Sequence, residues 1–301
     1  MSLAPRLAKK VDVAIQIHGK PYQSAVALLS LARHCERWIS TIFIGIDRRQ
    51  PERFDLAALL KDIRLPIRWH RPLFWLGIDQ LQPSWLLRFP PYRRSIRYQL
   101  AWETTRQPFL FVSHNDMLYR GDLIGAYLDQ IGGAIAIGQV GQCWNCEASY
   151  AGVCSPDRFR ELRPSQTEYV QLLAETRPGP RRNRYPDLSG LDPVWPLPEC
   201  RLNEFAALIN LDMARPLSYP LGPVLPFGAP LELDVGSHWF RHMWTLGHEI
   251  RHFDFNSLAT HGWAMDGYGG AVSASELELY QKTEQIALDL LRRDYGFHSK
   301  V

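Results

Sequence analysis

Residues 11–46 read VDVAIQIHGKPYQSAVALLSLARHCERWISTIFIGI, and this stretch decides the fold class. The β-rich run 11–17 ends in a turn signal, His18-Gly19-Lys20-Pro21, and an apolar helical pattern follows over 24–38. A second β-rich run, 39–46, closes on Asp47. Strand, helix and strand in this order predict a βαβ unit and a parallel sheet. Ligands bind at the carboxyl ends of such strands, which places the turn 16–20 and Asp47 at a candidate site.

The rest of the chain continues the alternation of helical and strand patterns. The patterns predict further strands at 67–69, 109–113 and 134–137, and helices at 55–62, 92–105, 123–131, 202–213 and 238–246. Segment 71–91 is expected to be a structured loop, and 177–198 a Pro/Arg-rich loop. A capping box, Ser273 with Glu276, predicts a last amphipathic helix.

Composition restricts the class of protein. The chain has 301 residues, 46% hydrophobic and 22% charged, as in ordinary globular proteins. A net charge of +3 is too small to indicate nucleic acid as a partner. The N-terminal residues lack the apolar run of a signal peptide, and no long apolar window predicts a transmembrane helix. We therefore expect a cytoplasmic protein, while ten tryptophans leave peripheral membrane contact open.

An acid follows the apolar run FLFVS at 109–113, in the sequence His114-Asn115-Asp116. A carboxylate at a strand end beside a second ligand type suits Mg²⁺ or Mn²⁺, because substrate phosphates complete the coordination shell of such a cation. The other reading of this motif is structural: Asp116 would cap the following turn.

The order of these motifs resembles that of the GT-A-fold glycosyltransferases. Residues 11–35 resemble their opening strand and helix, FIGID their second strand with its nucleotide-contacting acid, and FLFVSHNDMLY the strand that ends in their Asp-X-Asp motif. Residues 232–263 resemble their acceptor-side segment, which ends in a histidine that completes the metal site. The resemblance covers residues 11–140 and 231–265. His114 departs from the pattern, since the family has an acid there.

The resemblance implies a fold, an activity and a set of residues. The fold is an α/β, mostly parallel sheet flanked by helices, with a Cys-rich insertion and a C-terminal helix. A nucleoside-diphosphate sugar would donate its sugar to a hydroxyl of a glycan or lipid-linked acceptor, with Mn²⁺ or Mg²⁺ assisting. The cation would be held by His114, Asp116 and His261, and the donor by Gln16, His18, Asp47 and Arg97. An inverting transfer needs a base for the acceptor hydroxyl, and the candidates are Asp234, Asp266 and Glu249. Asp234 can alternatively cap the helix that begins near Ser237.

Four of the five cysteines have the spacing of a metal site. Cys143 and Cys146 form a C-x₂-C pair, and Cys154 and Cys200 follow. Four thiolates would close a structural Zn²⁺ site. A redox pair or buried free cysteines are the alternatives.

Residues 248–252, His-Glu-Ile-Arg-His, match the HExxH motif of zinc peptidases. That motif requires a helix, whereas Gly247 ends the preceding helical pattern and favours a strand. A zinc-stabilised binding module without catalysis is a third possibility.

The motifs predict three parts within one compact catalytic domain. Residues 1–140 form the nucleotide-sugar-binding half, and 141–230 the zinc-binding insertion with its loop. Residues 231–301 form the acceptor-side segment and the C-terminal helix, through which the chain could pair with a second copy.

Overall fold

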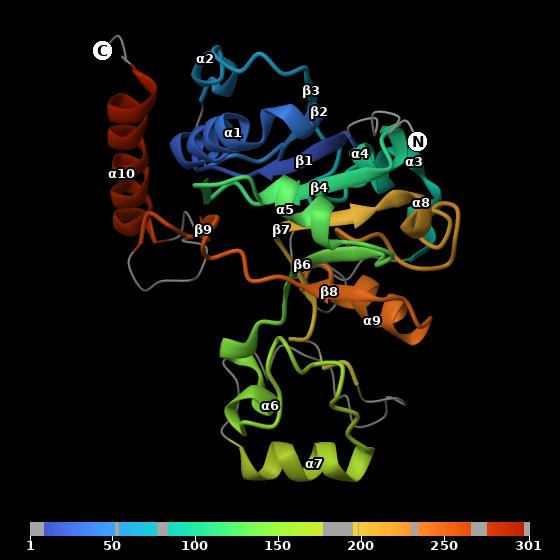
Figure 1. Cartoon of the computed structure of the whole chain (residues 1–301). Coiled ribbons are helices and arrows are strands. Elements are labelled where there is room, and N and C mark those ends of the chain that lie inside the picture. The colour runs from blue at the N-terminus through green and yellow to red at the C-terminus, as the bar shows by residue number, and fades with distance from the viewer. Residues whose placement is uncertain are drawn as a thin grey trace, which may run out of the picture.

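The computed structural model describes residues 9–51, 54–76, 84–176, 195–197, 199–229, 234–265 and 276–297 (Figure 1). Asp266, Ser273 and most of the loop 177–198 lie outside these ranges.

A seven-stranded sheet forms the centre of the molecule, in the order β3-β2-β1-β4-β7-β6-β8. All its strands run in one direction except β7, which is antiparallel to both β4 and β6. The strands are β1 (Val11–Ile17), β2 (Ile39–Ile46), β3 (Ile67–His70), β4 (Phe109–Ser113), β6 (Ala136–Val140), β7 (Leu202–Asn210) and β8 (Ile250–His252). Two short strands, β5 (Met117–Tyr119) and β9 (Ala259–His261), pair separately. The mostly parallel α/β sheet is therefore confirmed.

Helices cover both faces of the sheet, so its strands carry apolar side chains on both sides. In β1, Val13 and Ile15 join the hydrophobic cluster that contains α1 (Pro21–Cys35), α5 (Leu123–Gln130) and α10 (Leu277–Tyr295). Ala14 points to the opposite cluster, with side chains of α4 (Gln99–Thr104) and α9 (Ser237–Thr245). The remaining helices are short: η1 (Glu36–Trp38), α2 (Leu56–Leu59), η2 (Ser84–Arg88), α3 (Pro90–Arg93), η3 (Cys143–Asn145), α6 (Glu147–Tyr150), α7 (Gln166–Glu175) and α8 (Leu211–Ala214).

The C-terminal helix supplies the N-terminal cap of the first helix. Lys20 precedes α1 in a left-handed conformation (φ 54°), and no side chain caps α1 from that position. Glu284 of α10 instead accepts hydrogen bonds from the backbone N–H groups of Tyr22 (2.8 Å) and Gln23 (3.3 Å). A carboxylate there satisfies free N–H groups and interacts favourably with the helix dipole. Figure 1 shows α10 standing beside α1 at one end of the sheet.

Two helix predictions are wrong. The segment 202–213 forms the buried strand β7 and only then a helical turn, α8. Its apolar run lies between β4 and β6 with both faces covered, so periodicity could not distinguish the strand from a buried helix. The segment 92–105 is divided into α3 and α4 by Tyr98, whose φ is 64°. The loop 71–91 also contains η2 and the start of α3.

The insertion after β6 projects away from the sheet and carries α6 and α7 (Figure 1). No helix in the described part of the chain is both long and apolar enough to cross a bilayer.

Candidate metal and nucleotide site

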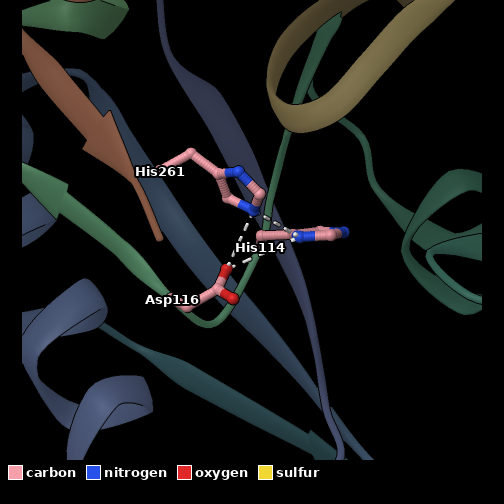
Figure 2. Close-up of side chains that lie close together, drawn as sticks. All are labelled: His114, Asp116 and His261. Carbon is pink, nitrogen blue, oxygen red and sulfur yellow. Dashed lines mark hydrogen bonds and ion pairs between the residues drawn. The ribbon is translucent and has the colours of Figure 1, made fainter. Parts of the chain in front are cut away.

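His114, Asp116 and His261 meet at the carboxyl edge of the sheet (Figure 2). His114 and Asp116 follow β4, and His261 ends β9, whose pairing with β5 sets it opposite Met117. The backbone N–H of Gly262 then donates to the carbonyl of Asp116 at 3.0 Å. The small β5–β9 sheet therefore brings together residues that lie 145 positions apart in the sequence.

The three side chains present ligand atoms in the arrangement a divalent cation needs. From Asp116 Oδ1, His261 Nε2 lies at 3.2 Å and His114 Nδ1 at 3.6 Å, and the two nitrogens are 3.3 Å apart. Ligands about 2.1 Å from a cation in octahedral geometry are about 3 Å apart. Asp116 Oδ1 is buried and has no hydrogen-bond partner among the described residues. The residues present therefore fit Mn²⁺ or Mg²⁺.

Two further charged groups hold this cluster in place. Lys20 Nζ donates to the other oxygen of Asp116 at 2.8 Å, and Lys20 is itself buried. Its backbone N–H donates to the hydroxyl of Tyr280 on α10 at 2.7 Å. On the other side, Glu204 of β7 lies 2.9 Å from His114 Nε2. A carboxylate behind a metal-binding histidine orients the ring and makes it more basic.

Opposite charges within the cluster stabilise one another, although burial disfavours the charged form of each group. Burial acts to raise the pKa of Asp116, but Lys20 and His261 hold it well below its usual range. Burial likewise acts against the charged form of Glu204, yet His114 and Arg97 lower its pKa to about 2. For His114, burial acts to lower the pKa, and Glu204 with Asp116 raises it to about 9. Both acids are therefore ionised, as cation ligands and their supporting groups must be.

The nucleotide candidates come together at the ends of β1 and β2. The side-chain amide of Gln16 donates to Asp47, and His18 Nδ1 lies 3.6 Å from the same carboxylate. Burial raises the pKa of Asp47, although Arg97 partly opposes that effect. Arg97 forms an ion pair with Glu204 at 3.2 Å, and the charges of Asp47 and Asp234 also act to raise its pKa. Arg97 therefore interacts both with Asp47 and with Glu204, the partner of His114 in the metal cluster.

Of the two base candidates that the structure describes, Asp234 is the one close enough to this site to interact with Arg97. Its carboxylate pairs with buried Arg201 at 3.0 Å and accepts from the N–H of Val235. The N-cap of α9 is Gly236, without a side-chain cap. Glu249 precedes β8, at the amino edge of the sheet, and binds Arg160 and Arg251. Asp266 lies outside the described residues.

A column of aromatic rings leads from the metal cluster to the surface. Phe205 stacks on His261 with the ring centroids 3.7 Å apart and the planes at 12°. Trp144 stacks in turn on Phe205 at 6.4 Å and 18°, and 47% of Trp144 is exposed. Trp144 lies between Cys143 and Cys146. The cysteine segment therefore presents a partly exposed aromatic ring, and Phe205 lies between that ring and His261.

The four cysteines lie in one region but do not form a ligand cluster. The backbone N–H of Gln142 donates to the backbone carbonyl of Glu199, which brings Cys143 near Cys200. Burial raises the pKa of Cys200, and the other three cysteines raise it further. Within the described residues, His114, Asp116 and His261 are the one group of three or more ligand atoms within 4.8 Å of one another. The spacing argument for zinc has no support from this geometry.

The HExxH interpretation is wrong. Helix α9 ends at Thr245, Gly247 has a φ of 80°, and residues 250–252 form strand β8 beside β6. His248 and His252 therefore do not share the face of a helix, which a zinc peptidase requires.

The sequence assigned no role to Glu204 or Lys20. Glu204 lay in a segment interpreted as a helix, where an isolated acid in an apolar run carried no signal. A buried charge within a strand would have indicated a functional role. Lys20 was part of the expected turn, but nothing in its spacing indicated that its side chain reaches Asp116.

Comparison with known proteins gives similarity of fold alone. No family model matches the chain, and no curated protein matches it significantly. Among solved structures, a mannosyltransferase from Pyrobaculum calidifontis, in complex with GDP-Man and Mn²⁺, is 8% identical with a TM-score of 0.49; the alignment covers 98% of this chain and 77% of that one. Glucosyl-3-phosphoglycerate synthase from Mycobacterium tuberculosis, with Mn²⁺, UDP and phosphoglyceric acid, is 12% identical, with 97% and 80% covered and a TM-score of 0.46.

A third similar structure has a different activity in its name. It is 4-diphosphocytidyl-2C-methyl-D-erythritol synthase from Anaerococcus prevotii, 9% identical, with 95% and 100% covered and a TM-score of 0.44. TM-scores this low carry no functional assignment, and the three names do not agree on one reaction. The function therefore has to be argued from the residues of the site.

Proposed function

We propose that this chain is a glycosyltransferase that uses a nucleoside-diphosphate sugar and a divalent cation. The observation that carries the proposal is the meeting of His114, Asp116 and His261 around a carboxylate oxygen that has no hydrogen-bond partner among the described residues. This cluster lies at the carboxyl edge of a parallel sheet, where α/β proteins bind nucleotides. Gln16, His18 and Asp47 lie at the same edge.

Each group at the site has a role in such a transfer. Gln16, His18 and Asp47 would bind the base or ribose, since they offer donors and an acceptor at adjacent strand ends. Arg97 would bind the diphosphate. When bound, Mn²⁺ or Mg²⁺ would neutralise charge on the leaving diphosphate. Glu204 fixes the ring of His114, and Lys20 fixes the carboxylate of Asp116.

The acceptor would lie on the Trp144 side. Aromatic faces pack against the apolar faces of sugar rings, so Trp144 favours a glycan or a lipid-linked sugar as the acceptor. Asp234 is the proposed base that takes the proton of the acceptor hydroxyl, for an inverting transfer. Its ion pair with Arg201, at 3.0 Å, holds the carboxylate in place. Asp234→Asn should therefore lower kcat and leave donor affinity unchanged.

The test is a thermal-shift panel of nucleoside diphosphates, each with Mn²⁺, with Mg²⁺ and with chelator. A ligand that binds the native state raises the Tm by mass action, so one base should stand out and should require the cation. Asp116→Asn should abolish that shift, and Glu103→Gln, which alters a partly buried acid away from the site, should retain it. If no nucleotide shifts the parent chain, the transferase is refuted in favour of the non-catalytic module.

A further inference from the structure

A surface of exposed aromatic and aliphatic side chains lies beside the edge strand β3. Twelve large hydrophobic side chains are exposed among the described residues, and five of them fall between positions 69 and 89. These five are Trp69 (44% exposed), Leu73 (59%), Phe74 (39%), Trp85 (68%) and Phe89 (51%). Hydrophobic residues gathered on a surface in this way, rather than scattered singly, mark an interaction site.

Contacts around Phe74 join the two chain segments that carry these side chains. Phe74 packs edge-on against Phe89 with centroids 6.4 Å apart, and against Tyr92 at 5.6 Å. The backbone N–H of Phe74 donates to Ser95, and His70 lies 2.9 Å from the carbonyl of Arg94. These bonds attach the segment after β3 to α3. We call the five exposed side chains the aromatic surface.

The described segments around the aromatic surface carry charge of one sign. Segments 63–76 and 84–98 contain no Asp or Glu, and they carry seven arginines. Arg64, Arg68, Arg71 and Arg88 are exposed. The other three form ion pairs: Arg93 and Arg94 with Glu103, and Arg97 with Glu204. A second copy of this chain would have to bring exposed acids to match these arginines, whereas an anionic lipid surface supplies negative charge uniformly.

We propose that the aromatic surface docks on an anionic membrane surface. Aromatic side chains partition to the level of the lipid headgroups, and flanking arginines are attracted to acidic lipids. Both kinds of side chain are exposed together in segments 63–76 and 84–98. The docking does not depend on the proposed transferase activity.

Docking would also bring the proposed nucleotide site close to the membrane. Arg48, next to Asp47, donates to the carbonyl of Leu73 at 3.3 Å, and Arg49 lies over the ring of Trp75. The aromatic surface therefore borders the end of β2, next to Asp47. For a lipid-linked acceptor, this neighbourhood would bring the reacting sugar to the site; that extension rests on the proposed function.

Vesicle flotation of the full chain tests the docking. We expect binding to vesicles of phosphatidylcholine mixed with phosphatidylglycerol, weak binding to phosphatidylcholine alone, and release by salt. Arg71→Gln with Arg88→Gln should weaken binding roughly twentyfold, at about fivefold for each arginine. Trp85→Ala with Phe89→Ala should weaken vesicle binding by at least about tenfold, because the apolar area that each ring would bury in the lipid is lost.

The matched control is Leu277→Ala with Arg292→Gln on α10, which Figure 1 shows at the other side of the molecule from α3. Leu277 is 60% exposed, and this pair should leave binding unchanged. The proposal is overturned if the parent chain binds neither vesicle, or if the control pair loses as much binding as the surface variants. Self-association that Trp85→Ala with Phe89→Ala abolishes, without vesicle binding, would instead assign the surface to a second copy. None of these measurements uses nucleotide, so failure here is distinct from failure of the transferase.

Discussion

Lys20 Nζ lies 2.8 Å from Oδ2 of Asp116, on the opposite side of the carboxylate from the two histidines. The lysine therefore occupies one oxygen and leaves the other for a cation. Lys20→Met would leave a buried carboxylate without its fixed counter-charge, at a cost of about 3–5 kcal/mol. Mn²⁺ can then supply the missing charge.

We expect Lys20→Met to lower the Tm in chelator and to show a larger Mn²⁺-induced rise in Tm than the parent chain. Differential scanning fluorimetry with and without Mn²⁺ measures both. An Mn²⁺ response equal to that of the parent would show that Lys20 does not share Asp116 with the cation.

Glu204→Gln should weaken Mn²⁺ binding by roughly tenfold to a hundredfold, because the partner of His114 determines the orientation and basicity of its ring. Isothermal titration with Mn²⁺ measures the effect. Glu103→Gln is the control: Glu103 is also an ion-paired carboxylate, partly buried and 2.5 Å from Arg93, but it is not next to a proposed ligand. Equal Mn²⁺ affinity in both variants would remove Glu204 from the site.

Asp47→Asn should reduce nucleotide affinity by roughly ten- to a hundredfold, the value of a hydrogen bond to a charged group. It should also alter stability with pH. Burial raises the pKa of Asp47 in the folded chain, so the folded state holds this proton more tightly than the unfolded state does. Stability from this group is present below pH 3.8 and is lost as the pH rises through the raised pKa.

The amide of Asn does not titrate, so Asp47→Asn does not lose this stability as the pH rises. The free energy of unfolding of Asp47→Asn, relative to the parent, should therefore increase between pH 4 and pH 7. Urea unfolding at both values measures it. A relative stability that falls over this interval would contradict the assigned direction of the pKa.

Trp144→Ala should raise the KM for a sugar acceptor about three- to tenfold, because one aromatic stacking contact is lost, and should leave donor affinity unchanged. Steady-state kinetics with the acceptor varied measures the change. Trp85→Ala removes another exposed tryptophan and should have no effect on a water-soluble acceptor. A changed donor affinity in Trp144→Ala would place the ring on the donor side.

The cysteine prediction concerns bound metal. Without metal, burial raises the pKa of Cys143 to about 11 and of Cys146 to about 12, so both thiols are protonated at neutral pH. Zinc must displace these protons, and its affinity should fall as the pH falls. Because the four thiols do not form a ligand cluster, we expect elemental analysis to find no zinc, and thiols that stay unreactive until the chain unfolds, as ordinary core residues do. One zinc per chain that is lost in Cys143→Ser but not in Cys35→Ser would contradict this.

The sequence predicted the parts of the fold in which each local pattern has one interpretation. The run 11–46 alternates β-rich and helical patterns with a turn between them, and β1, α1 and β2 form there. The meeting of His114 with His261 could be expected only from the resemblance, since the β5–β9 pairing that creates it spans three residues on each side. Glu204 could not be found, because burial on both faces of β7 removed the alternation that identifies a strand. The contact of Lys20 with Asp116 depends on the left-handed backbone conformation of Lys20 before α1, a conformation that lysine seldom adopts.

The cap that Glu284 places on α1 has a consequence for synthesis and folding. Its hydrogen bonds to Tyr22 and Gln23 join positions about 260 residues apart, as does the bond from Lys20 to Tyr280. Contacts of such long range form late, because the intervening chain must first be ordered. While the chain is still on the ribosome, β1 and β2 can pair, but the turn that carries Lys20 still lacks both partners from α10. The order of translation would thus keep the cation site incomplete until α10 has been synthesised.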